Sequence, residues 1–204
     1  MEYSTLRYEI AVAAAAMIAE EGLDYANAKR RAYERITGGK GSRIAKEVLP
    51  SNEEVEQAVR EHQAIFQSEA QPLRLRELRL KTLALMELLA DFSPMVTGAV
   101  ANGTASEHSD IHLHCFADSA KELGIYLLNH HISSEAGLMP NAKPGQPDVE
   151  ALAIQWQGEL ATIAVYPELE ARQNSPRQSK NKPDRINSRA LAALLETSAN
   201  QNTP

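Results

Sequence analysis

The residues best suited to chemistry lie in one short stretch, SDIHLHC, at positions 109–115. Asp110, His112 and His114 alternate there with apolar residues, which is the two-residue period of a β-strand. The three polar side chains are therefore expected on one face of a strand, with the apolar side chains turned to the core. A carboxylate beside imidazoles can bind a divalent cation or transfer a proton.

A glycine turn precedes this strand. Gly98 and Gly103 enclose the residues AVAN, and Met95–Val100 is an apolar run that predicts a strand leading into the turn. Because glycine has no side chain, backbone N–H groups at such a turn can approach a phosphate closely. The order strand, glycine turn, loop, strand is therefore expected between residues 95 and 116.

These motifs resemble those of the nucleotidyltransferase superfamily of the polymerase-β type. The family pattern is G-S, a second glycine and S-D-h-D, and the chain has Gly98-Ala99, Gly103 and Ser109-Asp110-Ile-His at matching spacing. The motif resemblance covers residues 94–167. The whole chain is also similar to a group of proteobacterial nucleotidyltransferase-like proteins that carry this S-D-I-H variant.

The resemblance implies a nucleotide or phosphate ligand and a role for each motif residue. In the family, strand carboxylates hold two divalent cations, which neutralise a triphosphate and align the attacking hydroxyl. The ion implied here is Mg²⁺ or Mn²⁺, with Zn²⁺ a weaker fit, and His112 would act as an auxiliary ligand or a base. The implied site residues are, for phosphate, Gly98, Ala99, Gly103 and Ser109; for catalysis, Asp110 and His112; and for the metal, Asp110, His112 and His114.

The chain departs from the family pattern at a phosphate-binding position and at the positions of two carboxylates. Ala99 stands where a serine is usual, and His112 replaces the second carboxylate. The later strand pair, where a third carboxylate is expected, offers Gln155, Gln157 and Thr162, with Glu159 at its turn. Magnesium prefers hard oxygen ligands, so an imidazole in place of a carboxylate weakens its binding. Asp148 and Glu150 are the remaining acids that could supply a third carboxylate.

Three interpretations of this stretch stay open. In the first, the glycine turn still binds a nucleotide or phosphate without efficient catalysis. In the second, the strand face binds zinc, manganese or iron, with a further ligand from elsewhere because alternate strand residues lie about 7 Å apart. In the third, the histidines are polar residues in a cleft without a function. The further ligands considered are Glu107, His108, His130 and His131.

The bulk composition narrows the function classes. The net charge of −6 argues against a protein that binds nucleic acid over its whole surface. A single cysteine excludes an internal disulfide and fits a reducing compartment. No stretch is long and apolar enough to span a membrane, and the N-terminal apolar run lacks the basic flank of a signal peptide. The expected location is the cytoplasm.

The remaining elements have clear local signals. Helical periodicity and caps predict helices over 4–21, 24–36, 51–66 and 72–91, with Asp24 and Ser51 as N-caps and Gly22 as a stop. Another capped helix is predicted from Ser119 to about His130, followed by a loop over 133–149. Strands 151–157 and 160–166 flank Gly158-Glu159, which predicts a hairpin with a type II′ turn.

These elements predict an α+β fold, since helices and strands are segregated along the chain. We expect a helical N-terminal region over 1–92, a small nucleotidyltransferase-like mixed sheet with flanking helices over 93–170, and a basic polar tail with a short helix over 171–204. The predicted function is a nucleotidyltransferase-fold protein with a degenerate metal site and weak or altered transfer. The alternative is a non-catalytic protein that recruits a protein partner, or a second copy, through its helical half.

Overall fold

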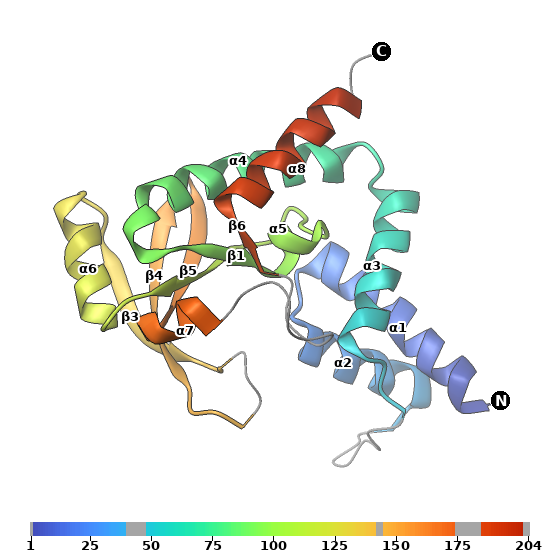
Figure 1. The fold of residues 1–204 in the computed structure, drawn as a ribbon. Coiled ribbons are helices and arrows are strands. Elements are labelled where there is room, and N and C mark those ends of the chain that lie inside the picture. The colour runs from blue at the N-terminus through green and yellow to red at the C-terminus, as the bar shows by residue number, and fades with distance from the viewer. Residues whose placement is uncertain (1, 40–47, 142–144, 174–184, 202–204) are drawn as a thin grey trace. The chain divides into compact units, whose positions relative to one another are not determined.

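The computed structural model describes residues 2–39, 48–141, 145–173 and 185–201. The sequence TGGKGS at 37–42 predicts a flexible break, which falls largely outside these ranges. The basic residues Arg177, Lys180 and Lys182 of the polar tail also lie outside them. The helices are α1 (Glu2–Glu21), α2 (Tyr25–Thr37), α3 (Asn52–Phe66), α4 (Ala70–Leu88), the 3₁₀ turn η1 (Ala90–Phe92), α5 (Gly98–Asn102), α6 (Ala120–Asn129), α7 (Glu168–Gln173) and α8 (Ser188–Gln201). The strands are β1 (Met95–Thr97), β2 (Ile111–Phe116), β3 (Ser134–Met139), β4 (Val149–Trp156), β5 (Glu159–Tyr166) and β6 (Ile186–Asn187) (Figure 1).

The predicted fold class is confirmed: a helical N-terminal region is followed by a mixed six-stranded sheet with flanking helices. The chain forms two compact units. The first comprises residues 1–75 and 104–109, and the second comprises residues 76–103 and 110–204. No helix among the described residues is long and apolar enough to cross a membrane.

The first unit is a packed set of helices with a core of small residues. Ile10 and Ala14 of α1 are fully buried against Ala28 of α2 and Val55 and Val59 of α3. Alanines at these positions let helix backbones approach, and the apolar contact drives their association. The N-caps predicted at Asp24 and Ser51 are both present, each accepting a backbone N–H bond.

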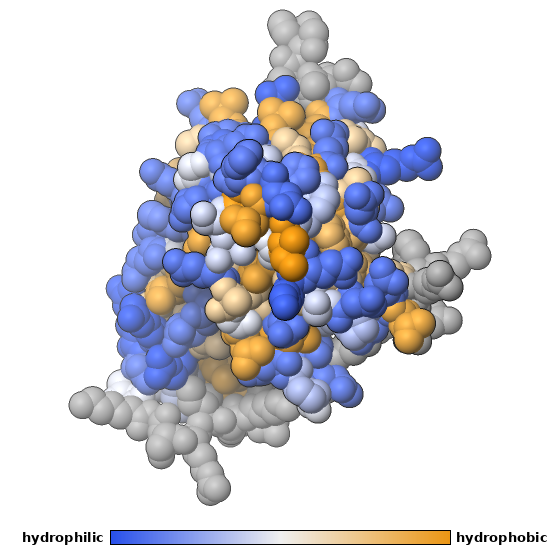
Figure 2. All heavy atoms as spheres, turned by 90° about the vertical axis from the view of Figure 1, so that its left-hand side faces the viewer, coloured by the Kyte–Doolittle hydropathy of each residue, from blue (hydrophilic) through white to orange (hydrophobic). Residues whose placement is uncertain are grey.

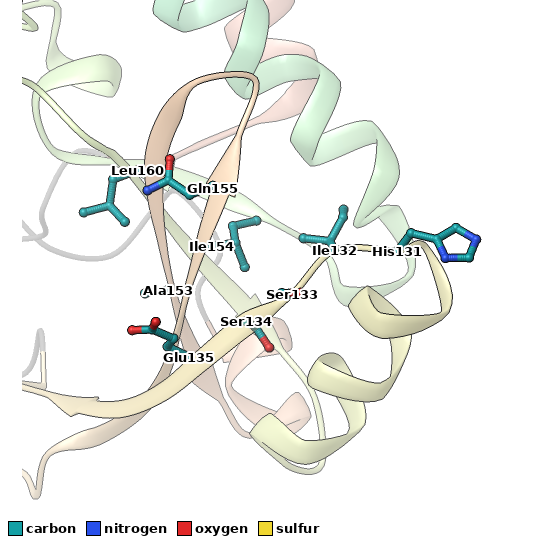
Figure 3. A pocket seen from close by; sticks show the side chains of 9 residues that line it. All are labelled: His131, Ile132, Ser133, Ser134, Glu135, Ala153, Ile154, Gln155 and Leu160. Carbon is teal, nitrogen blue, oxygen red and sulfur yellow. The ribbon is translucent and has the colours of Figure 1, made fainter.

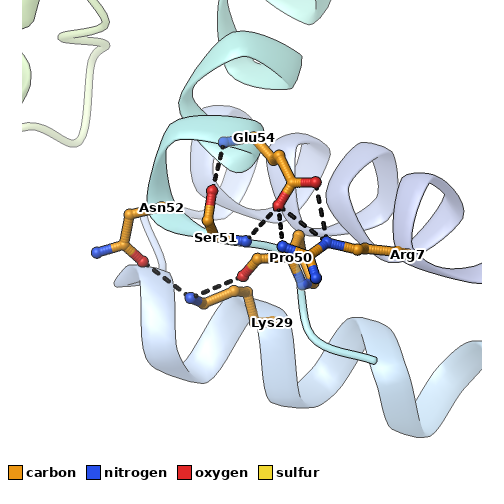
Figure 4. A network of polar contacts seen from close by, with 6 residues as sticks. All are labelled: Arg7, Lys29, Pro50, Ser51, Asn52 and Glu54. Atoms are coloured by element: carbon orange, nitrogen blue, oxygen red, sulfur yellow. Dashed lines mark hydrogen bonds and ion pairs between the residues drawn. The ribbon is translucent and has the colours of Figure 1, made fainter. Parts of the chain in front are cut away.

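The Ser51 capping box is joined to α1 by an ion pair (Figure 4). The Glu54 carboxylate accepts from the Ser51 backbone N–H at 2.6 Å and from Arg7 at 2.6 to 3.0 Å. The Arg7 guanidinium is the main cause that holds the pKa of Glu54 at about 2. Lys29 donates to the Pro50 carbonyl at 3.2 Å and to Asn52 at 2.8 Å. One helix start therefore ties α1, α2 and α3 together.

The second unit is built on the strand order β3-β4-β5-β2-β1-β6. β2 runs parallel to β5 and antiparallel to β1, so the sheet is mixed. One face, carrying Val96, Leu113 and Ile163, is buried under α4 and α6. Trp156 fixes α4 to this face, because its indole N–H donates to the Lys81 carbonyl at 2.8 Å. The opposite face carries His112 and His114, and α7 covers one end of it.

Three local predictions are corrected. Residues 134–139 form β3, an edge strand, within the predicted loop 133–149; pairing with β4 supplies the backbone bonds that the polar sequence does not signal. The hairpin turn is Gln157-Gly158, and both residues have positive φ (49° and 86°), which is the type I′ pattern rather than II′. The predicted strand Met95–Val100 ends at Thr97, and α5 begins at Gly98.

Two helix-ending glycines give a test of packing in the first unit. Gly22 (φ 69°) and Gly38 (φ 67°) both adopt the left-handed conformation, which costs an alanine roughly 1–2 kcal/mol. A Cβ atom on Gly22 would lie 2.6 Å from Cβ of His108, whereas one on Gly38 would meet nothing within 4 Å. We expect Gly22→Ala to destabilise the protein by at least about 1 kcal/mol more than Gly38→Ala. Urea unfolding followed by circular dichroism measures the difference, and equal costs would contradict the contact with His108.

Candidate functional site

The polar face of β2 lies in the middle of the sheet. His112 is opposite Thr97 of β1 and Thr162 of β5, and His114 is opposite Met95 and Ala164. Opposite residues of paired strands share a face, so the alternation predicted for Asp110, His112 and His114 places both imidazoles on the face away from α4 and α6. Asp110 directly precedes the strand and is exposed.

The glycine turn lies against this face. Gly98 begins α5 with φ 69°, and a Cβ atom on it would lie 3.7 Å from Cδ2 of His112. Gly103 ends the helix with φ 91°, and its N–H donates to the Ala99 carbonyl at 2.9 Å. Gly98 therefore lies beside His112, whereas Ala99 and Gly103 are engaged in the short helix.

A buried arginine holds α5 in place. Arg79 of α4 is 8% exposed, and its Nε donates to the Val100 carbonyl at 3.1 Å. Burial lowers the pKa of this guanidinium. The bond satisfies a carbonyl of a helix that is too short to satisfy all of its own. The position of the glycine turn therefore depends on α4.

Ser109 makes local bonds within the first unit. Its hydroxyl oxygen accepts from the Ser106 N–H at 2.9 Å, and its own N–H donates to the Ser106 carbonyl at 3.2 Å. The predicted phosphate contact of Ser109 would therefore compete with a turn that the hydroxyl already stabilises.

The acids considered as a third carboxylate lie elsewhere. Glu159 pairs with Lys81 at 2.6 Å, on the face covered by α4. Glu150 accepts from the Ala120 N–H at 3.3 Å and so caps α6 on the same covered face. Asp148 precedes Val149, which packs against the cluster of Phe116, Ala164 and Tyr166 at the opposite end of β2 from Asp110. None of the three lies beside Asp110.

The histidines considered as further metal ligands have other contacts. His108 packs on Gly22 in the first unit, and Nδ1 of His130 lies 3.0 Å from the Tyr126 carbonyl. His131 lines a separate hollow. Glu107 belongs to the first unit and is exposed.

The donor set on the histidine face does not fit a two-metal centre. The side chains of β5 on this face are Leu160, Thr162, Ala164 and Tyr166, so neither β2 nor β5 adds a carboxylate to Asp110. Within the described parts of the chain, no group of three or more His, Cys, Asp or Glu side chains could hold a metal ion. Metal binding by Asp110, His112 and His114 stays a prediction.

Burial favours the neutral form of both imidazoles, of which His114 is buried and His112 is half-buried. Burial is the main cause of the lowered pKa of His112, and the negative charge of Asp110 opposes it. Burial is also the main cause that lowers the pKa of His114, to about 3. His114 is 4% exposed, and its Nδ1 atom has no hydrogen-bond partner among the described residues. An unsatisfied buried polar atom costs about 1–3 kcal/mol, so this one requires an explanation.

Sequence reasoning placed Arg185 in the basic polar segment and did not single it out from the other basic residues there. Arg185 directly precedes β6, and its guanidinium carbon lies 5.5 Å from the centroid of the Tyr166 ring. The His114 ring lies 4.8 Å from the same centroid, and the Arg185 charge contributes to the lowered pKa of His114. No sequence signal separates Arg185 from the other basic residues near it, because only the pairing of β6 with β1 brings it to this face.

On the covered face, Cys115 is inert. Its side chain is fully buried, and burial raises the pKa of the thiol to about 12. A thiol in this state is not a nucleophile.

A separate hollow of about 350 Å³ lies at the β3 edge (Figure 3). It is lined by residues of β3, β4 and β5, including Glu135, Ala153 and Gln155, while the His131 ring points outward. The lining has a carboxylate and no lysine or arginine, which does not suit a phosphate. On the side that carries α6 and β3, apolar side chains also reach the surface, among them Leu128 and Leu138 (Figure 2).

Comparisons of the chain with models of known families, with curated proteins and with solved structures found no match.

The buried imidazoles predict a pH dependence of stability. In the unfolded chain histidine binds a proton near pH 6.5, whereas folded His114 does so only near pH 3, so the unfolded state takes up more protons between these values. The free energy of unfolding should therefore fall by about 1.4 kcal/mol per pH unit as pH drops through this window, and His112 adds to the slope. The charges of Arg185 and His112 act on His114, and the Tyr166 ring packs on it; Asp110 acts in turn on His112, and Glu170 on Arg185.

Urea unfolding of the wild type, His114→Gln and the exposed control His131→Gln between pH 4.5 and 7 measures this slope. We expect the slope to decrease in His114→Gln alone. An unchanged slope in that variant would show that His114 is not buried in its neutral form.

Proposed function

We propose that the chain is a nucleotidyltransferase-fold protein that binds a nucleotide or another phosphate compound at the histidine face of its sheet. The observation that supports the proposal is the proximity of Gly98 to His112, since these residues belong to the two halves of the motif. A Cβ atom on the left-handed Gly98 would lie 3.7 Å from the imidazole, so the glycine keeps the space beside His112 free of a side chain.

In this proposal the main role of the site is to bind the nucleotide or phosphate compound, and nucleotidyl transfer is secondary. Asp110 is the exposed carboxylate at the start of β2, and His112 beside it is neutral at pH 7, able to accept or donate one hydrogen bond. Weak or altered nucleotidyl transfer with His112 as a base belongs to the same proposal. Recruitment of a protein partner through the helical half remains the alternative from a different functional class.

A matched pair of variants tests the proposal. Thermal shift against the four common nucleoside triphosphates, each with Mg²⁺, Mn²⁺ or Zn²⁺ and without an ion, should show stabilisation of the wild type. A ligand at 100 times its Kd stabilises the folded state by about 2.7 kcal/mol, which is a measurable change in Tm. Asp110→Asn should alter this shift, whereas Asp118→Asn, an exposed acid just beyond the other end of β2, should not.

The sign of the Asp110→Asn effect distinguishes two modes of binding. If the phosphates bind as a metal complex, loss of the carboxylate weakens binding. If they bind without an ion, loss of a negative charge strengthens it. Absence of any stabilisation of the wild type, or equal effects of both variants, would contradict the proposed site.

A further inference from the structure

The histidine face carries a guanidinium as well as its two imidazoles. The strands β4 and β5 add no acid beside His112. Arg185 reaches the same face from the strand on the other side of β1. Near Tyr166 the guanidinium supplies a positive charge, which attracts anions.

Two polar atoms on this face lack hydrogen-bond partners among the described residues. Nε of Arg185 and Nδ1 of His114 are both buried, and neither has a hydrogen-bond partner among the described residues. Both groups pack on the same ring, with the guanidinium carbon at 5.5 Å and the imidazole centroid at 4.8 Å from the centroid of Tyr166. Stacking on a rigid ring fixes the directions of both side chains before any ligand arrives.

The charges that act near Arg185 come from α7 and from the start of β2. Glu170 of α7 acts on Arg185 through its charge, and Asp110 lies at the far end of the strand from Tyr166. Nε of Arg185 has no hydrogen-bond partner among the described residues. A half-buried guanidinium near a neutral imidazole is a combination suited to an oxyanion, which accepts hydrogen bonds from both.

We propose that Arg185 and His114 form a receptor for a phosphate group, so that the histidine face binds an anion directly through protein N–H donors. The Arg185 guanidinium supplies the positive charge, and the His114 imidazole, protonated on Nδ1 alone, donates a neutral hydrogen bond. Tyr166 positions both side chains. This inference rests on the proposed function, because it takes the bound anion to be a phosphate group of the ligand proposed there.

Binding of inorganic pyrophosphate, measured by calorimetry at fixed ionic strength without divalent ions, tests the receptor. We expect Arg185→Gln to weaken binding about 10- to 100-fold, the effect of removing a charge-assisted hydrogen bond. Arg189→Gln is the matched control, because Arg189 is an exposed arginine close in sequence whose loss changes the net charge equally. Equal binding by the two variants would overturn the proposal.

A second measurement uses the wild type, so that it does not depend on the folding of a variant. The ¹⁵N resonance of His114 Nδ1 should move when pyrophosphate saturates the protein, while that of the exposed His131 should not. An unchanged His114 resonance at saturation would also overturn the receptor.

The outcomes separate this inference from the proposed function. If nucleotides bind with sensitivity to Asp110→Asn but without sensitivity to Arg185→Gln, the receptor is wrong and the proposed function stands. If pyrophosphate binding depends on Arg185 and no nucleotide binds, the receptor stands and the nucleotide assignment is wrong. If the wild type binds neither pyrophosphate nor nucleotides, both proposals are wrong.

Discussion

The placement of two imidazoles, one buried and one half-buried, on one face of a central strand is the constraint that shapes the second unit. β2 has its apolar side chains under α4 and α6, so its alternate positions must face the other way, whatever their polarity. An ordinary core would have apolar residues there, because burying a group that binds protons costs stability as the pH falls. The polar face is therefore maintained against a stability cost, which is typical of a functional surface.

The supporting elements fix the backbone around this face firmly, whereas they fix the side chains on the face less firmly. Arg79 holds α5, Trp156 and Lys81 tie the β4–β5 hairpin to α4, and Glu150 caps α6. Each of these contacts satisfies a backbone group or a charge that the sheet alone would leave unpaired. In contrast, two polar atoms on the histidine face, on His114 and Arg185, are left without partners by the described residues.

Local signals in the sequence predicted local structure well. Asp24 and Ser51 could be recognised as caps because their partners lie three residues away, and the alternation around His112 needed only the strand period. β3 was not predictable in this way, since an edge strand of SEAGLM is defined by its pairing with β4 rather than by its own propensity. Arg185 was missed for the same reason, because a long-range strand pairing selects it from a polar segment.

The single cysteine of the chain gives β2 a built-in chemical reporter. Cys115 lies at the centre of the sheet with a thiol that burial keeps protonated, so reagents that alkylate thiolates reach it only when the strands separate. The rate of its alkylation in the native protein would therefore record how often β2 detaches from its neighbours. Any ligand that holds the strands together would slow that rate without being labelled itself.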